Sequence, residues 1–308
     1  MDLFTSTLSQ IAFLFGFIAI GFILAKGKIL PENSATVLSK LENNVFIPAL
    51  VMGTFIENFT VERISAAREL LITSSIIALI AAPVAILISK LVTKDRYIQK
   101  IYTYGLAFSN FGFMGNAVVM GLFPDIFFEY LIFTLPLWTL IYLWGVPRLL
   151  ITGEEKQSFL KSLKAFINPM FIAMIIGMLA GVLKIPVPGW IMSLINTSGS
   201  CMSPIAMILT GVVVSSISFK KTFLDARIYI ITFVRLLLIP LAFIGVATFL
   251  NMSETVYICA LCSLSMPLGL STIVIPSAYG KDTSVAAGMT IVSHLLSAIT
   301  IPFIFAVI

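Results

Sequence analysis

Two asparagines and two glycines lie inside an apolar run that would otherwise be read as one membrane helix. The stretch is "SNFGFMGNA", residues 109–117, and it contains Asn110, Gly112, Gly115 and Asn116. The two amides are six residues apart, so on an intact helix they would face different directions. Amide groups can bind a carboxylate, and glycine tolerates non-helical backbone. We therefore predict a helix that is broken around Gly112, Gly115 and Asn116, with a substrate site at the break.

A second interrupted run, "LSMPLGLSTIVIP", occupies residues 264–276. Pro267 has no backbone N–H, so a kink or break is expected there. A helix that opens inside a membrane must face protein or a wet cavity, and its exposed N–H groups favour an anion. The substrate-binding candidates in this run are Met266, Pro267, Gly269, Ser271 and Thr272.

Other polar residues inside apolar segments are also candidates. Arg235 is the one cation well inside such a segment, and two roles stay open for it: attraction of an organic anion, or support of carbonyl groups freed by a broken helix. His294 is the only histidine. It could couple transport to protons, because imidazole titrates near pH of about 6.5, or it could bond to a neighbouring hydroxyl or carbonyl. Asn44 could line the substrate route, whereas Glu42 is assigned to capping and loop solvation.

The side chains that perform metal or nucleophilic chemistry are sparse. One histidine cannot build a His-rich metal centre, and Cys201, Cys259 and Cys262 lie in apolar segments, where buried small hydrophobes are expected. No Ser/His/Asp set and no pair of carboxylates lies at one depth. We expect no metal, no cofactor and no enzymatic activity.

Composition defines the elements that must position these candidates. The chain is 59% hydrophobic and 11% charged, with a mean hydropathy of +1.08. A soluble domain needs a more polar exterior, whereas about 20 apolar residues cross a bilayer as a helix. Ten apolar segments are predicted, at residues 7–25, 36–56, 69–89, 101–123, 129–151, 166–184, 190–217, 227–250, 255–278 and 284–308. The expected class is an all-α membrane protein with ten transmembrane helices.

The loop cations predict an orientation. Of the 19 Lys and Arg residues, fifteen lie in the loops after the odd-numbered segments, and only Arg63, Arg68 and Lys184 lie on the other side. The cation-rich side is expected to face the cytoplasm, so both termini of a multi-pass cell-membrane protein would face outward. The cations form no continuous stripe, which argues against nucleic acid as a partner.

The second half of the chain resembles the first at a spacing of 156 or 157 residues. Gly21 pairs with Gly177 and Pro48 with Pro204 at 156, while Pro83 pairs with Pro240, Gly112 with Gly269 and Asp125 with Asp282 at 157. These matches predict two repeats of five helices. An odd number of helices per repeat inverts the second copy, and inverted repeats with paired interrupted helices are typical of secondary transporters.

Four motifs, in this order and spacing, resemble the auxin efflux carrier family, which includes plant auxin exporters and bacterial malate and malonate permeases. They are "LENNVFIPALV" (41–51), "SNFGFMGNAVVMGLF" (109–123), "FVRLLLIPLA" (233–242) and "SMPLGLSTIVIPSAYGKD" (265–282). The resemblance implies the inverted-repeat fold of bile-acid symporters and sodium/proton antiporters, with broken helices 4 and 9 that cross.

The same resemblance implies two domains and an elevator mechanism. Scaffold helices would occupy residues 1–60 and 153–218, with dimerisation through the scaffold, and a mobile transport domain would occupy 61–152 and 219–308. Two positions depart from the family pattern. Ala117 stands where the family usually has proline after Gly115 and Asn116, and Ser271 stands where it usually has asparagine. Substrate contacts inferred from that asparagine do not transfer.

Several functions were weighed against one another. The leading hypothesis is a secondary transporter of small organic anions in the lipid bilayer, such as malate, malonate or auxin-like acids. Its alternative is a sodium- or proton-coupled symporter of the bile-acid type, although none of the 14 acids lies deep in the two interrupted segments. A channel would more naturally show a symmetric pore motif, and a membrane enzyme lacks a catalytic set.

Overall fold

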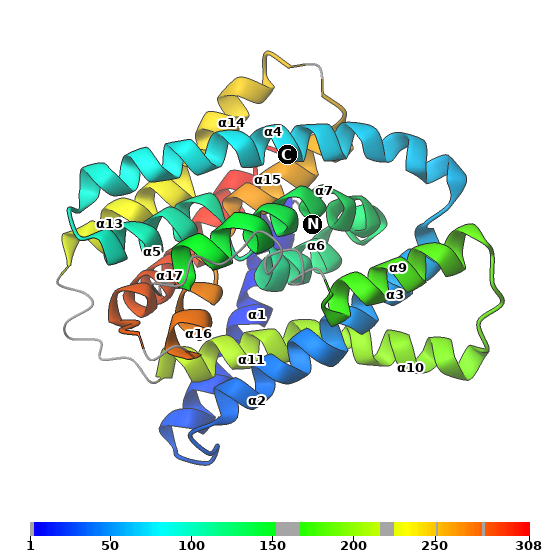
Figure 1. Cartoon of the computed structure of the whole chain (residues 1–308), viewed down its shortest axis with the longest axis horizontal. Helices are drawn as coiled ribbons and strands as arrows, with labels where there is room; N and C mark the ends of the chain where they lie inside the picture. Colours follow the sequence, from blue (N-terminus) through cyan, green and yellow to red (C-terminus); the bar gives the residue numbers. More distant parts are fainter. Residues whose placement is uncertain (1–2, 152–166, 216–224, 251, 279–280) are drawn as a thin grey trace.

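The structure is a computed structural model and describes residues 3–151, 167–215, 225–250, 252–278 and 281–308. Within these ranges the chain is helical, and its one β-type pairing is an isolated bridge. All ten apolar segments contain helix. Figure 1 shows long helices that run along the molecule, with the two chain ends near its middle.

The helices of the first half are α1 (Leu3–Lys26), α2 (Ser34–Leu41), η1 (Glu42–Phe46), α3 (Ile47–Asn58), α4 (Val61–Val92), α5 (Arg96–Ala107), η2 (Phe111–Gly115), α6 (Asn116–Leu122), η3 (Pro124–Ile126), α7 (Phe127–Leu140) and η4 (Ile141–Leu150). Those of the second half are α9 (Pro169–Val182), α10 (Gly189–Ser200), α11 (Met202–Ser215), α13 (Ala226–Phe233), η5 (Val234–Leu238), α14 (Ile239–Ala247), α15 (Glu254–Ser265), α16 (Ser271–Ala278) and α17 (Ser284–Phe305). η1, η2, η4 and η5 are π-helical turns, and η3 is a short 3₁₀ turn.

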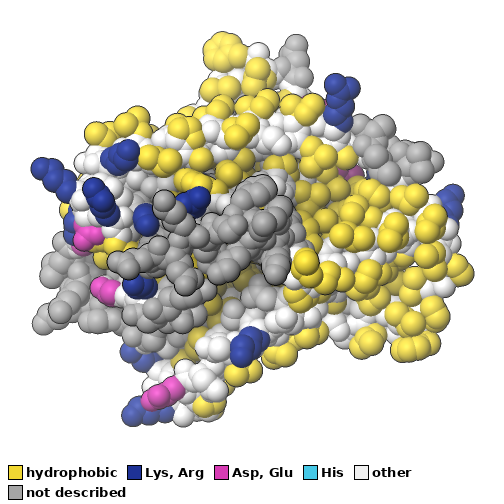
Figure 2. All heavy atoms as spheres, viewed as in Figure 1, with side chains coloured by type: hydrophobic (Ala, Val, Ile, Leu, Met, Phe, Trp, Pro, Cys, Tyr) yellow, Lys and Arg dark blue, Asp and Glu magenta, His cyan; other side chains and the backbone are white. Residues whose placement is uncertain are grey.

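The described helices include membrane-spanning candidates of two lengths. Six helical stretches are long and apolar enough to cross a membrane, among them Leu3–Lys26 and Ser284–Phe305. Three shorter apolar helices, Phe111–Leu122, Pro169–Val182 and Glu254–Ser265, accompany them. Figure 2 shows a broad apolar surface with Lys and Arg side chains gathered mainly toward the left end of the view. The fold is therefore that of a multi-pass helical membrane protein, and the count of ten crossings stays a prediction.

Equivalent helices of the two halves pack in equivalent ways. The two most extensive helix pairs are α1 with α11 and α3 with α9. A Cβ added to Gly21 would lie 3.0 Å from the Ile208 Cα, and one added to Gly177 would lie 2.9 Å from the Met52 carbonyl oxygen. The glycines at 21 and 177 are 156 apart, and so are their partners at 52 and 208. The repeat found in the sequence is therefore also a repeat of helix contacts.

One sequence assignment is wrong in the fold. Glu42, which was assigned to capping and loop solvation, is fully buried, and neither of its carboxylate oxygens has a hydrogen-bond partner in the structure. The reason is that α2, η1 and α3 run as one continuous helix through this position. Glu42 is the first residue of η1, so it lies against the neighbouring helices instead of in a loop.

Candidate functional site

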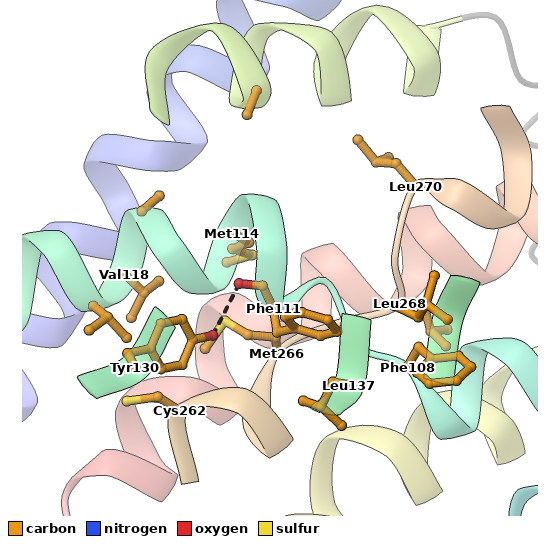
Figure 3. Packing of buried hydrophobic residues seen from close by; sticks show 14 of the residues in the cluster. Phe108, Phe111, Met114, Val118, Tyr130, Leu137, Cys262, Met266, Leu268 and Leu270 are labelled. Carbon is orange, nitrogen blue, oxygen red and sulfur yellow. Dashed lines mark hydrogen bonds between the residues drawn. The ribbon is translucent and has the colours of Figure 1, made fainter. Parts of the chain in front are cut away.

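The two interrupted helices open opposite each other. α5 ends at Ala107 and α15 ends at Ser265, and the residue after each end, Phe108 or Met266, has an extended backbone. Ser109 and Leu268 form an antiparallel β-bridge, and the Asn110 backbone N–H donates to the Pro267 carbonyl at 2.7 Å. Figure 3 shows this region from close by, with Phe111 of one arm next to Met266 of the other. Both predicted breaks are confirmed, and the two arms touch.

The position of the first break differs from the prediction. The break was expected around Gly112, Gly115 and Asn116, but it lies at residues 108–110, which contain neither glycine nor proline. Gly112 and Gly115 belong to the π-helical turn η2, and Asn116 begins the regular helix α6. The glycines make room for neighbours: a Cβ on Gly112 would lie 2.5 Å from the Trp138 ring, and one on Gly115 would overlap the Tyr130 hydroxyl.

Arg235 lies between the two helix ends and donates to both. Its side chain is 1% exposed. One Nη1–H donates to the Leu106 carbonyl of α5 at 2.9 Å. Nε and Nη2 donate to three carbonyls of the other arm, those of Met266 at 3.3 Å, Ser263 at 3.3 Å and Leu264 at 3.0 Å.

The last carbonyls of a helix have no partner within the helix, and a buried carbonyl without a partner is costly. One guanidinium therefore caps the C-terminal ends of both broken helices. Of the two roles left open for Arg235, these contacts support the structural one.

Asn110 and His294 form a buried polar pair at the crossing. They are 2% and 3% exposed, and the Asn110 Nδ2 lies 3.2 Å from the His294 Nε2. The His294 Nδ1 is 2.8 Å from the Thr290 carbonyl, which can only accept, so Nδ1 carries the proton. Nε2 is then a lone-pair acceptor for the Asn110 N–H. The Asn110 Oδ1 is buried and has no hydrogen-bond partner in the structure.

The remaining candidates of the second arm lie at the crossing itself. Met266 is fully buried, and Gly269 faces the first arm, since a Cβ there would lie 3.4 Å from the Ser109 carbonyl oxygen. Ser271 begins α16, and the Thr272 hydroxyl donates to the Gly269 carbonyl at 2.9 Å. Together with Pro267, these residues form the second arm of the crossing, and their role in substrate binding stays a prediction.

Two amides stand apart from this group. Asn116 is buried at the start of α6, one turn beyond the break. Asn44 is exposed and donates to the Lys40 carbonyl of its own helix at 2.7 Å. Among the described residues, no hydrogen bond joins Asn44 to the crossing.

Other residues fasten the arms and were not predicted. The Tyr130 hydroxyl donates to the Phe111 carbonyl at 3.0 Å, drawn as the dashed line in Figure 3. The Leu268 backbone N–H donates to the Ser293 hydroxyl at 3.2 Å, and the Ser109 hydroxyl donates to the Ser263 carbonyl at 2.7 Å. A signal for part of this set exists in the sequence, because Thr290, Ser293, His294 and Ser297 form a polar stripe at helical spacing within an apolar segment.

A multi-pass helical chain whose two discontinuous helices meet end to end inside the protein has the architecture of a membrane transporter. Comparison with known families agrees. A family model described as "Membrane transport protein" matches residues 6–157 and again residues 154–305, so each half of the chain is matched. The chain belongs to this membrane transport protein family, as its resemblance to the auxin efflux carriers predicted.

A curated relative extends over nearly the whole chain. It is an "Uncharacterized transporter" of Methanothermobacter thermautotrophicus, 24% identical over 292 residues, which cover 92% of this chain and 93% of the relative. The double family match confirms the two-repeat architecture.

Proposed function

We propose that the protein is a secondary transporter of small organic anions across the cell membrane and that the crossing is its substrate site. The expected substrates are carboxylates such as malate, malonate or auxin-like acids. The observation that carries the proposal is the antiparallel meeting of two broken helices beside Asn110, an amide that is buried and has an unpartnered oxygen. Buried polar groups inside membrane proteins mark substrate pathways.

The electrostatics of the crossing favour an anion. Two helices end there, α5 and α15, and the negative ends of both are capped by Arg235. Two helical stretches also begin there, at Phe111 and Ser271, and the first N–H groups of a helix have no partner within it. The Thr272 and Ile273 N–H groups at the start of α16 bond to the Gly269 and Leu270 carbonyls. The proposed anion site is therefore the start of the first stretch, at Phe111, and a carboxylate is the complementary group.

The fold we propose has ten membrane helices in two inverted five-helix repeats. A two-fold axis through the crossing pairs equivalent segments antiparallel, as Ser109 and Leu268 are paired. The same axis relates the pair α1 and α11 to the pair α9 and α3. The matching close contacts of Gly21 and Gly177 in these two pairs support it. In this arrangement both termini lie on the outer side, as the loop cations predict.

Two domains follow from which helices pack together. α1, α2, α3, α9, α10 and α11 pack mainly on one another, and α4, α5, α7 and α13 to α17 form a second group. We assign the first group to a scaffold, residues 1–60 and 153–218, and the second to a mobile transport domain, residues 61–152 and 219–308. Elevator-type movement of the second group would carry the crossing from one membrane face to the other. A homodimer would form through the scaffold.

A sodium-coupled symporter is the alternative that a specific observation favours. The Asn110 Oδ1 and the Ser265 Oγ are both buried near the crossing without a hydrogen-bond partner. Oxygen atoms of this kind can ligate a cation, although a carboxylate usually accompanies them. Transport that requires a sodium gradient would select this alternative.

Counterflow in proteoliposomes tests the transporter. Purified protein is reconstituted with unlabelled acid inside, and entry of radiolabelled malate, malonate and indole-acetate is followed. We expect exchange of at least one acid, a reduction of about tenfold or more in Asn110→Leu, and wild-type exchange in Asn43→Leu. Asn43 is an exposed amide that bonds within its own helix, so it is a matched control. Absence of exchange across the panel would overturn the proposal.

A further inference from the structure

The bond between Asn110 and His294 depends on which atom carries a proton. The Thr290 carbonyl holds the proton of His294 on Nδ1, which leaves a lone pair on Nε2. The Asn110 amide must therefore present its N–H₂ to Nε2, because its oxygen would bring two lone pairs together. The amide oxygen consequently points elsewhere, and it has no partner in the structure.

We propose that His294 and Asn110 form a proton-controlled contact for the substrate carboxylate. When Nε2 takes a proton from water, it becomes a donor and can no longer accept from the Asn110 amide. The amide then turns over by about half a turn, so that Oδ1 accepts from Nε2–H and the N–H₂ takes the place of the oxygen. The free position of Asn110 changes from an acceptor to a donor, and a donor is what binds a carboxylate. This inference rests on the proposed carboxylate site.

The surroundings of His294 provide no counter-charge for an imidazolium. α17 packs against α1, α5, α11, α13, α15, α16 and η5. The buried titratable or charged residues on these elements are Tyr102, Tyr104, Arg235, Cys259 and Cys262. The one carboxylate that they carry among the described residues, Glu254, is the first residue of α15. The crossing follows the other end of this 12-residue helix, about 17 Å away.

A charged His294 would therefore have no buried negative group on the described helices that pack against α17 unless an anion arrives. Arg235 donates to four backbone carbonyls, and no carboxylate in the described part of the chain pairs with it. A substrate carboxylate would supply the missing negative charge, so proton and anion favour each other's binding. One proton enters with each carboxylate from one side of the membrane, and Nε2 returns it to water after the anion leaves on the other side.

A proton gradient separates this step from transport itself. Wild-type proteoliposomes with an acidic exterior should accumulate labelled carboxylate, and exchange without a gradient should be about tenfold faster at pH 5.5 than at pH 7.5. In His294→Gln the side-chain amide can still bond to Asn110 but cannot titrate in this range. We expect this variant to exchange more slowly than wild type at pH 5.5, to lose accumulation, and to differ by less than about twofold in exchange between the two pH values.

The single histidine also allows a readout on the wild-type protein that does not depend on any variant folding. In ¹⁵N NMR of histidine-labelled protein at pH 7.5, Nδ1 should be protonated and Nε2 should show the shift of a bare nitrogen. Adding the exchanged carboxylate near pH 6 should convert the signals to those of imidazolium.

The inference is overturned by a proton on Nε2 at pH 7.5, by no conversion of the NMR signals on adding the acid, or by a gradient response that survives His294→Gln. Wild-type exchange that does not respond to the proton gradient would contradict the proton step but not the proposed transporter. No exchange of any acid would remove both.

Discussion

The two arms of the crossing are equivalent in backbone and different in chemistry. Asn110 lies opposite Pro267, and these positions are themselves equivalent at a spacing of 157. Directly opposed residues of an antiparallel pair can exchange two hydrogen bonds, but Pro267 has no N–H to give, so the structure has one. The Asn110 carbonyl accepts instead from the Gly115 N–H at 2.9 Å.

The same asymmetry continues around the crossing. His294 corresponds to Leu137 at a spacing of 157, and Arg235 corresponds to Ala78. The first arm therefore has a polar partner from the second repeat, whereas the equivalent position beside the second arm is aliphatic. The two repeats therefore share the crossed backbone, whereas His294 and Arg235 both come from the second repeat.

Removing Arg235 should have the largest effect, because one side chain from the second repeat caps both arms. Arg235→Met leaves at least three carbonyls without their donor, and we expect the free energy of unfolding to fall by about 3 kcal/mol or more. Unfolding in mixed micelles of increasing SDS content measures it. Arg227→Met is the control, since Arg227 is half-exposed and pairs with the neighbouring Asp225 instead of capping a helix end. Equal stability of the two variants would mean that the broken ends need no cap.

The glycines at the contact of α1 with α11 and of α3 with α9 should respond alike, because there the repeats agree. A Cβ on Gly21 meets the backbone of Ile208, and one on Gly177 meets the backbone of Met52. Backbone cannot rotate away, so each Gly→Ala variant should lose about 2 kcal/mol. Gly16→Ala on α1 has open space and should be neutral or slightly stabilising. Losses that differ between Gly21 and Gly177 would contradict the reciprocal packing.

The equivalent glycines of the two arms should respond differently. A Cβ on Gly112 would lie 2.5 Å from the Trp138 ring, whereas one on Gly269 would make an ordinary contact of 3.4 Å with the Ser109 carbonyl oxygen. We expect Gly112→Ala to lose about 1–2 kcal/mol and Gly269→Ala to change by less than about 0.5 kcal/mol. Trp138→Leu should restore part of the loss in the double variant. A larger cost at Gly269 would show that the second arm is the more tightly packed one.

The sequence indicated this fold through long-range regularities. Apolar segments of membrane length and the recurrence of Gly21, Pro48 and Gly112 at a spacing of 156 or 157 residues were enough to predict two repeats and two interrupted helices. The exact break was not predictable from local chemistry. Residues 108–110 contain no helix breaker, and they are held out of the helix by the opposite arm and by the capping of α5, which involve residues more than 100 positions away.

The candidate site was predictable only in part for the same reason. Asn110 and Pro267 stand out by residue type, and the structure joins them. The pairing of Asn110 with His294 spans 184 positions, so no motif contains both residues. Asn44 is also an amide, but it lies on an exposed helix face and bonds to a carbonyl of its own helix. Residue type alone does not distinguish such an amide from one at a binding site.

Removing the hydroxyl group that bonds to each arm should give the smallest difference in stability between the two arms. Ser293→Ala leaves the Leu268 N–H without its partner, which should cost about 1–2 kcal/mol. Tyr130→Phe should cost less, about 0.5–1 kcal/mol, because the Phe111 carbonyl keeps the N–H of Asn116. Thermal unfolding of both variants in one detergent gives the comparison. Since Ser293 does not titrate, its variant should keep the pH response expected of His294. An equal loss in the two variants would mean that the arms are fastened alike and that their asymmetry is confined to Asn110, His294 and Arg235.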